Sequence, residues 1–158
     1  MSDAPRSDDL TDEAVLRAVT EVFYDYAEAV DDGDPERFAE LFTADCRFDG
    51  GEPAPGREWL ARHAGRVLAQ FTATSHHISQ IRVRSWDGER AKVSAYVIAH
   101  HRMLDGNTFD ALGRYRSTLV IDDGRWRFAE HDILFHDNIG TDGRTYLRID
   151  RADLSRYR

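Results

Sequence analysis

The second half of the chain contains four strand-length runs separated by three short turns, and this order restricts the possible fold most strongly. The turns are Asp87-Gly88, Asp105-Gly106-Asn107 and Asp122-Asp123-Gly124, whose residues tolerate the positive φ angles of hairpin turns. Runs joined by such turns pair as antiparallel neighbours. The sequence therefore predicts a meander with strands at 76–85, 91–103, 108–121 and 125–137.

The first part of the chain shows helical periodicity instead. Apolar residues recur at three- and four-residue steps, so a first helix is expected at about 11–32. Gly33 suits the C′ position that ends such a helix, and Asp34 followed by Pro35 is typical of the start of another. The sequence thus predicts a long helix, a tight turn and a short second helix. The apolar stripe of the long helix comprises Val15, Val19, Val22, Phe23, Tyr26 and Val30.

A short extended piece at 46–49 and a loop rich in Gly and Pro follow the second helix. A third helical pattern then begins near Trp59 and continues to about Thr72. Helices that precede strands in this way predict a layered α+β architecture, because a curved sheet buries one face against the helices. We therefore expect an α+β fold in which a cone-like, curved antiparallel sheet packs on three N-terminal helices.

The length of the chain predicts one domain, since 158 residues suffice for a core that needs no disulfide or metal. We expect residues 1–10 to be disordered, residues 11–139 to form the domain, and residues 140–158 to be a C-terminal tail. The tail is rich in Arg and Asp, so we expect it either to pack on a partner subunit or to fray.

The charge and cysteine content argue against several classes of protein. A net charge of -8 repels phosphate backbones, so no nucleic-acid partner is expected. The single cysteine, Cys46, cannot form an internal disulfide, and no zinc-ligand spacing is present, which favours a cytoplasmic protein without a structural metal. No apolar run approaches the roughly 20 residues of a membrane span, and residues 1–10 lack the pattern of a signal peptide. We therefore expect no membrane partner.

Two histidine pairs, His76-His77 and His100-His101, lie on predicted strands. Because successive side chains of a strand point to opposite faces, each pair should place one imidazole on the concave face of the sheet and one on its back. Histidine exchanges a proton near neutral pH, so two concave-face rings near a carboxylate and a phenol indicate acid–base chemistry. Paired histidines also occur as surface residues of half-exposed strands, and the sequence leaves this alternative open.

A resemblance to a known superfamily is carried by four segments: YAEAVDDGDPERFAELFTADCRFDG, TSHHIS, DGERAKVSAYVIAHH and DDGRWRF. In this order they resemble the nuclear transport factor 2-like fold and, within it, the SnoaL-like group, over roughly residues 11–138. The resemblance implies the α+β cone. It does not imply one activity, because this fold hosts dehydratases, isomerases, epoxide hydrolases, polyketide cyclases, dioxygenase small subunits and non-catalytic binders.

In its order of elements the chain resembles scytalone dehydratase and the bile-acid dehydratases. In these enzymes an Asp at the end of the first helix supports a His on the first long strand, and the resemblance places these roles on Asp31 and His76. A phenol five residues before the Asp falls on Tyr26. Scytalone dehydratase carries a second pocket His on the next strand, which the resemblance assigns to His101 rather than His100. The implied catalytic residues are Tyr26, Asp31, His76 and His101.

Two other activities of the fold match these residues less well. The oxyanion-hole tyrosine of ketosteroid isomerase corresponds to Tyr26, but its general-base position falls on Gly50, with Asp49 one residue early. The second oxyanion position of that family falls near Ser117. Limonene epoxide hydrolase needs an Asp-Arg-Asp set in the pocket. The residues that could match this set are Arg114 or Arg82 together with Asp110.

Each candidate also has a purely structural explanation. Tyr26 lies on the apolar stripe of the first helix, where a buried tyrosine often only satisfies a backbone carbonyl. Asp31 opposes the helix macrodipole by about 0.3–1 kcal/mol, so a compensating contact is expected. Trp126 and Phe128 are interpreted as core residues, and the other histidines as packing or surface residues. These histidines are His63, His77, His131 and His136.

We interpret the candidate residues as a cofactor-free elimination site. Tyr26 would hydrogen-bond and polarise the carbonyl of a cyclic substrate, and His76, oriented by Asp31, would remove an α-proton. His101 would protonate or hold the leaving hydroxyl. Without a leaving group the same residues would isomerise or cyclise the substrate. An apolar lining suited to polyketide- or steroid-like substrates is predicted from Phe23, Trp59, Phe71 and Leu112.

The expected partners are a hydrophobic small molecule and further copies of the chain. An apolar back face of the sheet would suit a homodimer or a higher homo-oligomer. The principal alternative to an enzyme is a non-catalytic small-molecule-binding protein or a small structural subunit. The enzyme predicts a contact between Asp31 and His76, whereas the alternative predicts no hydrogen-bonded pair.

Overall fold

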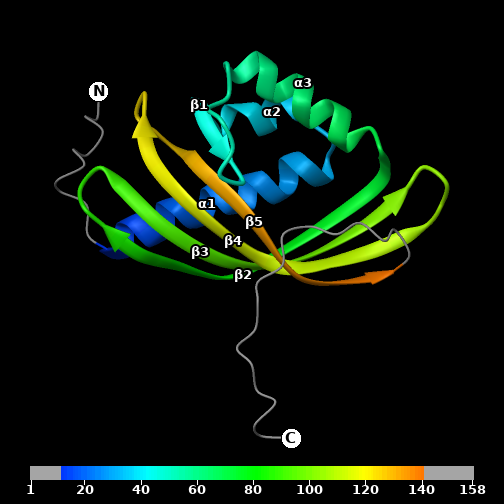
Figure 1. Ribbon diagram of the computed structural model, residues 1–158. Helices are drawn as coiled ribbons and strands as arrows, with labels where there is room; N and C mark the ends of the chain where they lie inside the picture. The colour runs from blue at the N-terminus through cyan, green and yellow to red at the C-terminus, as the bar shows by residue number, and fades with distance from the viewer. Residues whose placement is uncertain (1–11, 141–158) are drawn as a thin grey trace, which may run out of the picture.

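The computed structural model describes residues 12–140 of the protein (Figure 1). Three helices come first in the chain and four long strands follow, with one short strand between the second and third helices. The helices are α1 (Asp12–Asp31), α2 (Pro35–Glu40) and α3 (Arg57–Leu68). The strands are β1 (Phe42–Phe48), β2 (Phe71–Trp86), β3 (Arg90–Met103), β4 (Thr108–Asp122) and β5 (Arg125–Gly140). The α+β class is confirmed.

The five strands form one curved sheet in the order β1-β5-β4-β3-β2. Strands β2 to β5 pair antiparallel, as the predicted meander. The short extended piece predicted at 46–49 belongs to β1, which was not predicted to join the sheet and pairs parallel to β5 with Phe42 opposite Phe128. Short turns reveal only the pairing of neighbouring strands, whereas β1 and β5 are far apart in the sequence. The sheet is therefore mixed, with β1 at one edge.

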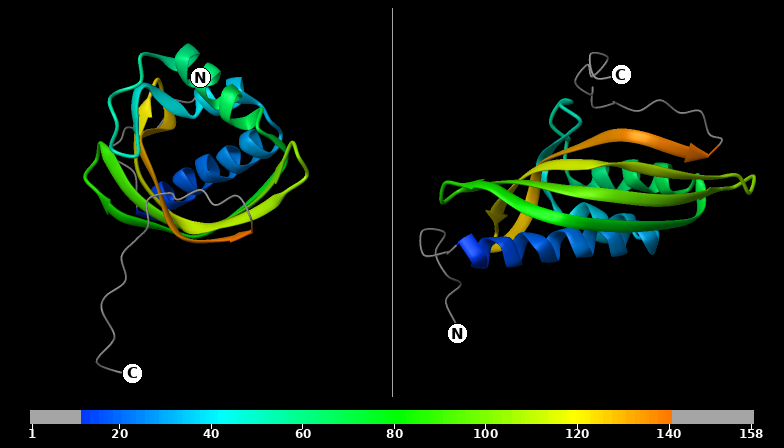
Figure 2. Two further views of the ribbon diagram at one scale, coloured as in Figure 1. Left: turned by 45° about the vertical axis from the view of Figure 1, so that its right-hand side comes forward. Right: turned by 90° about the horizontal axis from the view of Figure 1, so that it is seen from below.

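Helix α1 lies on the concave side of the sheet, and α2 and α3 are on the same side (Figures 1 and 2). The apolar stripe predicted for the first helix is buried there, with Val15, Val19 and Phe23 fully inaccessible to solvent. Alternate residues of β3 and β4 face the helices and are buried as well. Removal of this apolar surface from water is the main stabilising contribution to such a core.

The predicted turn between the first two helices is confirmed. Gly33 has a φ of +67°, a left-handed conformation that glycine adopts without steric cost. The Asp34 side chain accepts a 2.9 Å hydrogen bond from the backbone N–H of Arg37, and Pro35 occupies the first turn of α2. Because this turn fixes where α1 ends, it also fixes the position of Asp31.

The boundary between α3 and β2 differs from the prediction. The third helix ends at Leu68 rather than near Thr72, and β2 begins at Phe71. The apolar pattern continues past the end of the helix, but Phe71 pairs with Met103 of β3. Pairing with a neighbouring strand therefore overrides the local helical periodicity.

The predicted disordered segment 1–10 and residues 141–158 of the predicted tail lie outside the described residues. Gly140, the first residue of that tail, is the last residue of β5. None of the three described helices combines the length and the apolar content that a membrane-spanning helix needs.

Strand β5 contains an extra residue relative to β4 near its beginning. The consecutive residues Thr118 and Leu119 of β4 pair with Glu130 and Phe128, which leaves Ala129 as a β-bulge. A bulge reverses the alternation of faces along its strand. Consequently, two side chains three positions apart both point toward the helices. These side chains are Phe128 and His131.

A second extra residue lies where β5 passes very close to β4. Phe135 pairs with Gly113, and Asp137 pairs with the residue before Gly113, so His136 is the unpaired residue. A Cβ atom at Gly113 would lie 2.5 Å from the carbonyl oxygen of Leu134, so this approach requires glycine. The alternation of faces on β5 therefore changes twice.

Candidate active site

The strand pairing sorts the two histidine pairs as their alternation predicts. His76 lies opposite Ala99, a buried residue of β3, so its ring is on the concave, helix-facing side. His101 shares this face, because it pairs with the buried Phe109. One histidine of each pair therefore faces the helices. The outward-facing members of the pairs are His77 and His100.

His76 and Asp31 are in direct contact. Asp31 is the last residue of α1, and its Oδ1 lies 2.7 Å from Nδ1 of His76 near the start of β2. The second carboxylate oxygen accepts a 2.8 Å hydrogen bond from the backbone N–H of His76. The hydroxyl of Thr74 donates to Oδ1 at 2.9 Å. The His76 side chain is 7% exposed and that of Asp31 is 26% exposed, so the pair is largely shielded from water.

These hydrogen bonds compensate the placement of Asp31 at a helix C-terminus. Burial raises the pKa of this carboxyl, but the hydrogen bonds from the His76 ring, the His76 backbone and Thr74 outweigh it, and the pKa lies below its ordinary value. Asp31 is therefore ionised at neutral pH. Because a carboxylate only accepts hydrogen bonds, Nδ1 of His76 carries a hydrogen, and Nε2 of the neutral ring is the proton-accepting atom. This arrangement is that of an oriented general base.

His101 lies beside His76 on the neighbouring strand. The centroids of the two rings are 5.5 Å apart and their planes meet at 81°, so the edge of one ring faces the other. The His101 ring stacks on Phe109 at 4.4 Å and lies 4.9 Å from Phe71. Aromatic contacts thus fix the orientation of His101, and Phe71, a predicted substrate contact, lies next to it.

Tyr26 lies on the buried stripe of α1, with its ring centroid 6.4 Å from that of His76 and 5.6 Å from that of Tyr115. Burial raises the pKa of Tyr26 to about 12, and burial also raises the pKa of Tyr115 well above its ordinary value. The two hydroxyls are hydrogen bonded to each other. Each hydroxyl carries one hydrogen, so the pair keeps one hydroxyl hydrogen that can be donated to a ligand.

A further histidine, His131 of β5, is fully buried next to these tyrosines. Its ring centroid lies 5.1 Å from that of Tyr26 and 4.7 Å from that of Tyr115, and its Nδ1 lies 2.9 Å from Oγ of Ser117. Burial lowers the pKa of His131 to about 3, so the ring is neutral. Its Nε2 is buried and has no hydrogen-bond partner within residues 12–140. His131 therefore places an unused polar atom beside the candidate site.

The sequence did not single out His131, and the bulge at Ala129 explains why. On a regular strand, His131 and Phe128 would point to opposite faces, because they are three residues apart. The extra residue brings both to the helix-facing side. No turn residue or glycine marks the bulge in the sequence, so no local signal could have identified this histidine.

The remaining predicted lining residues lie in different environments. Phe23 is fully buried in the aromatic core between α1 and the sheet. Trp59 is half-buried on α3 and stacks on His63 with centroids 5.0 Å apart. Leu112 pairs with the exposed Ile98 on the convex face, so the sheet separates it from His76 and His101, contrary to the prediction. The alternation along β4 causes this, because both neighbours of Leu112 point toward the helices.

Asp31, His76, His101 and Tyr26 thus belong to one cluster on the concave side of the sheet. The cluster offers a proton acceptor, a second imidazole and a phenolic hydrogen-bond donor, which together can perform acid–base chemistry on a bound organic molecule. Within the described residues, no group of three or more His, Cys, Asp and Glu side chains is placed to hold a metal ion.

Solved structures from several proteins share the fold. The chain is similar to a candidate scytalone dehydratase from Novosphingobium aromaticivorans, with a TM-score of 0.80 and 28% identity over 89% of this chain and 97% of that one. It is similar to a candidate aromatic ring hydroxylase from the same organism, with a TM-score of 0.73 and 26% identity over 80% and 92% of the two chains. A LinA-type3 hexachlorocyclohexane dehydrochlorinase from Novosphingobium barchaimii has a TM-score of 0.71 and 16% identity over 87% and 97%, which shows the fold alone.

The sequence matches no protein among those with curated functions. It does match the model of a SnoaL-like domain over residues 12–132, which is most of the chain. This range includes α1 with Asp31, all of β2 to β4, and β5 as far as the bulge and His131. The chain therefore belongs to the SnoaL-like family of the nuclear transport factor 2-like superfamily.

Proposed function

We propose that the protein is a cofactor-independent lyase that eliminates water from a cyclic carbonyl compound. The observation that carries this proposal is the hydrogen-bonded Asp31–His76 pair on the concave side of the sheet. Membership of the SnoaL-like family and the similarity to a candidate scytalone dehydratase support an enzyme that acts on a small molecule. The reaction itself is inferred from the chemistry of the site.

In the first step His76 removes a proton from the carbon next to the substrate carbonyl. Asp31 holds the ring by Nδ1, so that Nε2 accepts the proton, and its negative charge stabilises the resulting imidazolium. The hydroxyl of Tyr26 donates a hydrogen bond to the carbonyl oxygen, where negative charge develops. With a pKa of about 12, Tyr26 keeps its proton at neutral pH and remains a donor.

In the second step the carbon–oxygen bond to the leaving hydroxyl breaks and a carbon–carbon double bond forms. His101 gives a proton to the hydroxyl, which leaves as water. His76 then holds the proton that the substrate lost. Because the two rings are 5.5 Å apart, transfer through one water molecule from His76 to His101 would restore both residues.

The proposed substrate is hydrophobic and resembles a polyketide or a steroid. The cluster is bordered by aromatic side chains, since Phe71 and Phe109 contact His101, and Phe38 and Phe128 contact Tyr26. Apolar side chains bind the body of such a molecule, and a few polar groups orient it. No cofactor is part of the proposal, because each proton transfer is assigned to a side chain of the cluster.

Two other functions use the same residues or the same fold. A substrate without a leaving group would be isomerised or cyclised after the same proton removal. A non-catalytic subunit is the other alternative, because the beta subunit of a candidate aromatic-ring-hydroxylating dioxygenase has the same fold, with a TM-score of 0.64 and 19% identity. An isomerase or cyclase would form a product that has not lost water, and a non-catalytic subunit would form no product.

The test begins with thermal-shift screening of cyclic ketones and polyketides, followed by incubation of the ligands found in D₂O. Wild-type protein should exchange the α-proton for deuterium, seen by NMR, and release a dehydrated product. His76→Ala should abolish the exchange, whereas His77→Ala should not, because its side chain lies on the opposite face of β2. Exchange with an isomerised product would replace the lyase proposal by an isomerase. Binding without exchange would contradict an enzyme.

A further inference from the structure

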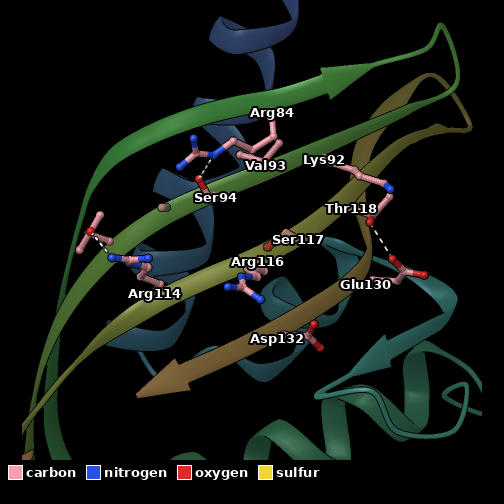
Figure 3. Close-up of a pocket in the computed structure, with 12 residues that line it drawn as sticks. Arg84, Lys92, Val93, Ser94, Arg114, Arg116, Ser117, Thr118, Glu130 and Asp132 are labelled. Carbon is pink, nitrogen blue, oxygen red and sulfur yellow. Dashed lines mark hydrogen bonds between the residues drawn. The ribbon is translucent and has the colours of Figure 1, made fainter. Parts of the chain in front are cut away.

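The convex face of the sheet carries a depression that the proposed reaction does not use. It has a volume of about 490 Å³ and lies over β2 to β5, on the side of the sheet away from α1 (Figure 3). Four cationic side chains line it, and Figure 3 shows them reaching over the outer surface of the strands. They are Arg84, Lys92, Arg114 and Arg116.

Positive charge exceeds negative charge in this depression, although the whole chain has a net charge of -8. The four cations share the depression with two carboxylates, those of Glu130 and Asp132. Glu130 accepts a 2.6 Å hydrogen bond from the hydroxyl of Thr118, and its Oε1 lies 3.4 Å from Nη2 of Arg90. Asp132 accepts a hydrogen bond from the backbone N–H of Gly50 at 3.1 Å. Within residues 12–140, none of the four cations forms an ion pair.

The register of the strands places three arginines in the lining of one depression. Arg116 of β4 lies directly beside Ser94 of β3. Arg84 of β2 approaches Ser94 from the other side and donates from Nε to its Oγ at 2.7 Å. Arg114 lies two residues from Arg116 on the same face of β4. Arginines from β2 and β4 therefore line one depression on the convex face (Figure 3).

Tyr96 holds one of these arginines in a fixed orientation. Cζ of Arg114 lies 4.6 Å from the centroid of the Tyr96 ring, and Nη2 donates to the Tyr96 hydroxyl at 2.5 Å. Nε of Arg114 is buried and has no hydrogen-bond partner in the described part of the chain. A guanidinium that is already held in place loses little further side-chain entropy when it binds a ligand.

A second copy related by a two-fold axis through this depression would fit it poorly. A two-fold axis brings the same surface of both subunits together, so a dimer centred here would place the four cations of one copy against those of the other. Like charges brought together at an interface are unfavourable. A small anion instead supplies the negative charge that the depression lacks.

We propose that this depression binds a small organic polyanion, a ligand that carries phosphate or carboxylate groups, through Arg84, Arg114 and Arg116. Planar guanidinium groups form paired, charge-assisted hydrogen bonds with both kinds of group. The sheet separates this site from Asp31 and His76, so it is independent of the proposed elimination reaction.

Isothermal titration calorimetry at low ionic strength tests the proposal with two probes, inorganic pyrophosphate and citrate. Wild-type protein should bind pyrophosphate, citrate or both, and the preferred probe identifies the chemistry of the natural ligand. Arg116→Gln should weaken binding about tenfold or more, as loss of a charge-assisted hydrogen bond does. The control, Arg66→Gln, removes the same charge from an exposed position on α3 and should leave the affinity nearly unchanged.

Circular dichroism establishes that both variants are folded, and NMR amide shifts identify the residues that the anion perturbs. Shifts centred on Ser94 and Tyr96 would support the proposal. Equal weakening by Arg116→Gln and Arg66→Gln would overturn it, because the anion would then only screen the overall charge. Absence of binding to either probe would also overturn it. If Arg116→Glu in addition changed the oligomeric state in sedimentation experiments, the face would be an interface between copies.

Discussion

The two faces of the sheet carry two Asp–His pairs with the same geometry and different surroundings. On the concave face, Asp31 and His76 are 2.7 Å apart, and their side chains are 26% and 7% exposed. On the convex face, Asp110 and His100 are also 2.7 Å apart, but their side chains are 40% and 43% exposed. The distance between acid and imidazole therefore does not distinguish the two pairs.

The surroundings of each pair decide what it can do. Asp31 receives additional hydrogen bonds from Thr74 and from the backbone of His76, so its position and its charge are fixed. Neighbouring rings shield that pair from water, and shielded electrostatic interactions are stronger. Solvent screens the interaction between Asp110 and His100, as for other surface ion pairs. Burial and further hydrogen bonds, rather than contact alone, identify a candidate dyad.

The largest expected difference between the pairs is in turnover. Asp31→Asn should lower kcat on the identified substrate by about 10²–10⁴-fold, because it preserves volume but removes the charge that orients and stabilises the His76 imidazolium. Asp110→Asn, the same substitution on the convex face, should leave kcat unchanged. Steady-state kinetics with both variants measure this difference. Equal activity of the Asp31 variant and wild type would rule out the dyad.

The next largest effect concerns Tyr26. If its hydroxyl stabilises the transition state, Tyr26→Phe should cost about 2–4 kcal/mol in kcat/KM and little in global stability. If the hydroxyl only satisfies Tyr115, the same change should lower the free energy of unfolding by about 1–3 kcal/mol and leave turnover intact. Kinetics and urea unfolding of the one variant separate these results. Tyr24→Phe, half-exposed on the same helix, is the control.

His131 should make the stability of the fold depend on pH. The folded protein protonates this ring only near pH 3, whereas the unfolded chain does so near its ordinary value of 6.5. The folded pKa is lowered, so the stabilising contribution is present above the unfolded pKa and is lost as the pH falls below it. From about pH 7 to about pH 5 the loss should be about 2 kcal/mol.

Urea unfolding of wild type and His131→Phe at both pH values isolates this contribution, because other groups titrate in both proteins. The variant should lose about 2 kcal/mol less than wild type over the same interval. The free energies of unfolding of the two proteins at one pH are not compared, because the substitution also removes the hydrogen-bond partner of Ser117. The contribution of Asp31, whose pKa is lowered from 3.8, is lost only at lower pH. Identical pH dependence of the two proteins would show that His131 titrates normally.

The smallest expected effect is on the exposed pair. Asp110→Asn should lower the free energy of unfolding by only about 0.2–1 kcal/mol, and salt should reduce the difference further. Chemical unfolding at low and high ionic strength measures it. A salt-independent loss as large as that of a buried pair would mean that Asp110 and His100 are covered in solution, and the contrast between the faces would disappear.

Strand alternation is the part of the molecule that the sequence predicts best. The period of two predicted that one histidine of each pair faces the helices. The register confirms this, with His76 and His101 on one face and His77 and His100 on the other. The turn at Gly33 and Asp34 was also predictable, because capping and positive φ depend on local chemistry. The family resemblance added the expected contact between Asp31 and a strand histidine, which periodicity could not supply.

The features that the sequence could not supply depend on contacts between distant segments. The parallel pairing of β1 with β5 joins residues far apart in the chain and leaves no turn signal. The start of β2 at Phe71 is set by its partner strand rather than by its own apolar pattern. Leu112 faces outward although it is apolar, because its position between two inward-facing residues of β4 decides its face. The catalytic roles of the concave-face residues remain predictions.

The bulge at Ala129 changes which positions of β5 point toward the helices. Phe128, at an even position, points inward before it, whereas after it His131 and Ile133, at odd positions, point inward. After the extra residue at 136, even positions point inward again, and Asn138 lies opposite the inward-facing Ala111. Deletion of Ala129 would therefore leave a regular strand in which Glu130 and His131 keep their partners, Thr118 and Ser117, and their faces. A relative that lacks this one residue would place its phenylalanine and histidine two positions apart and still point both toward the helices.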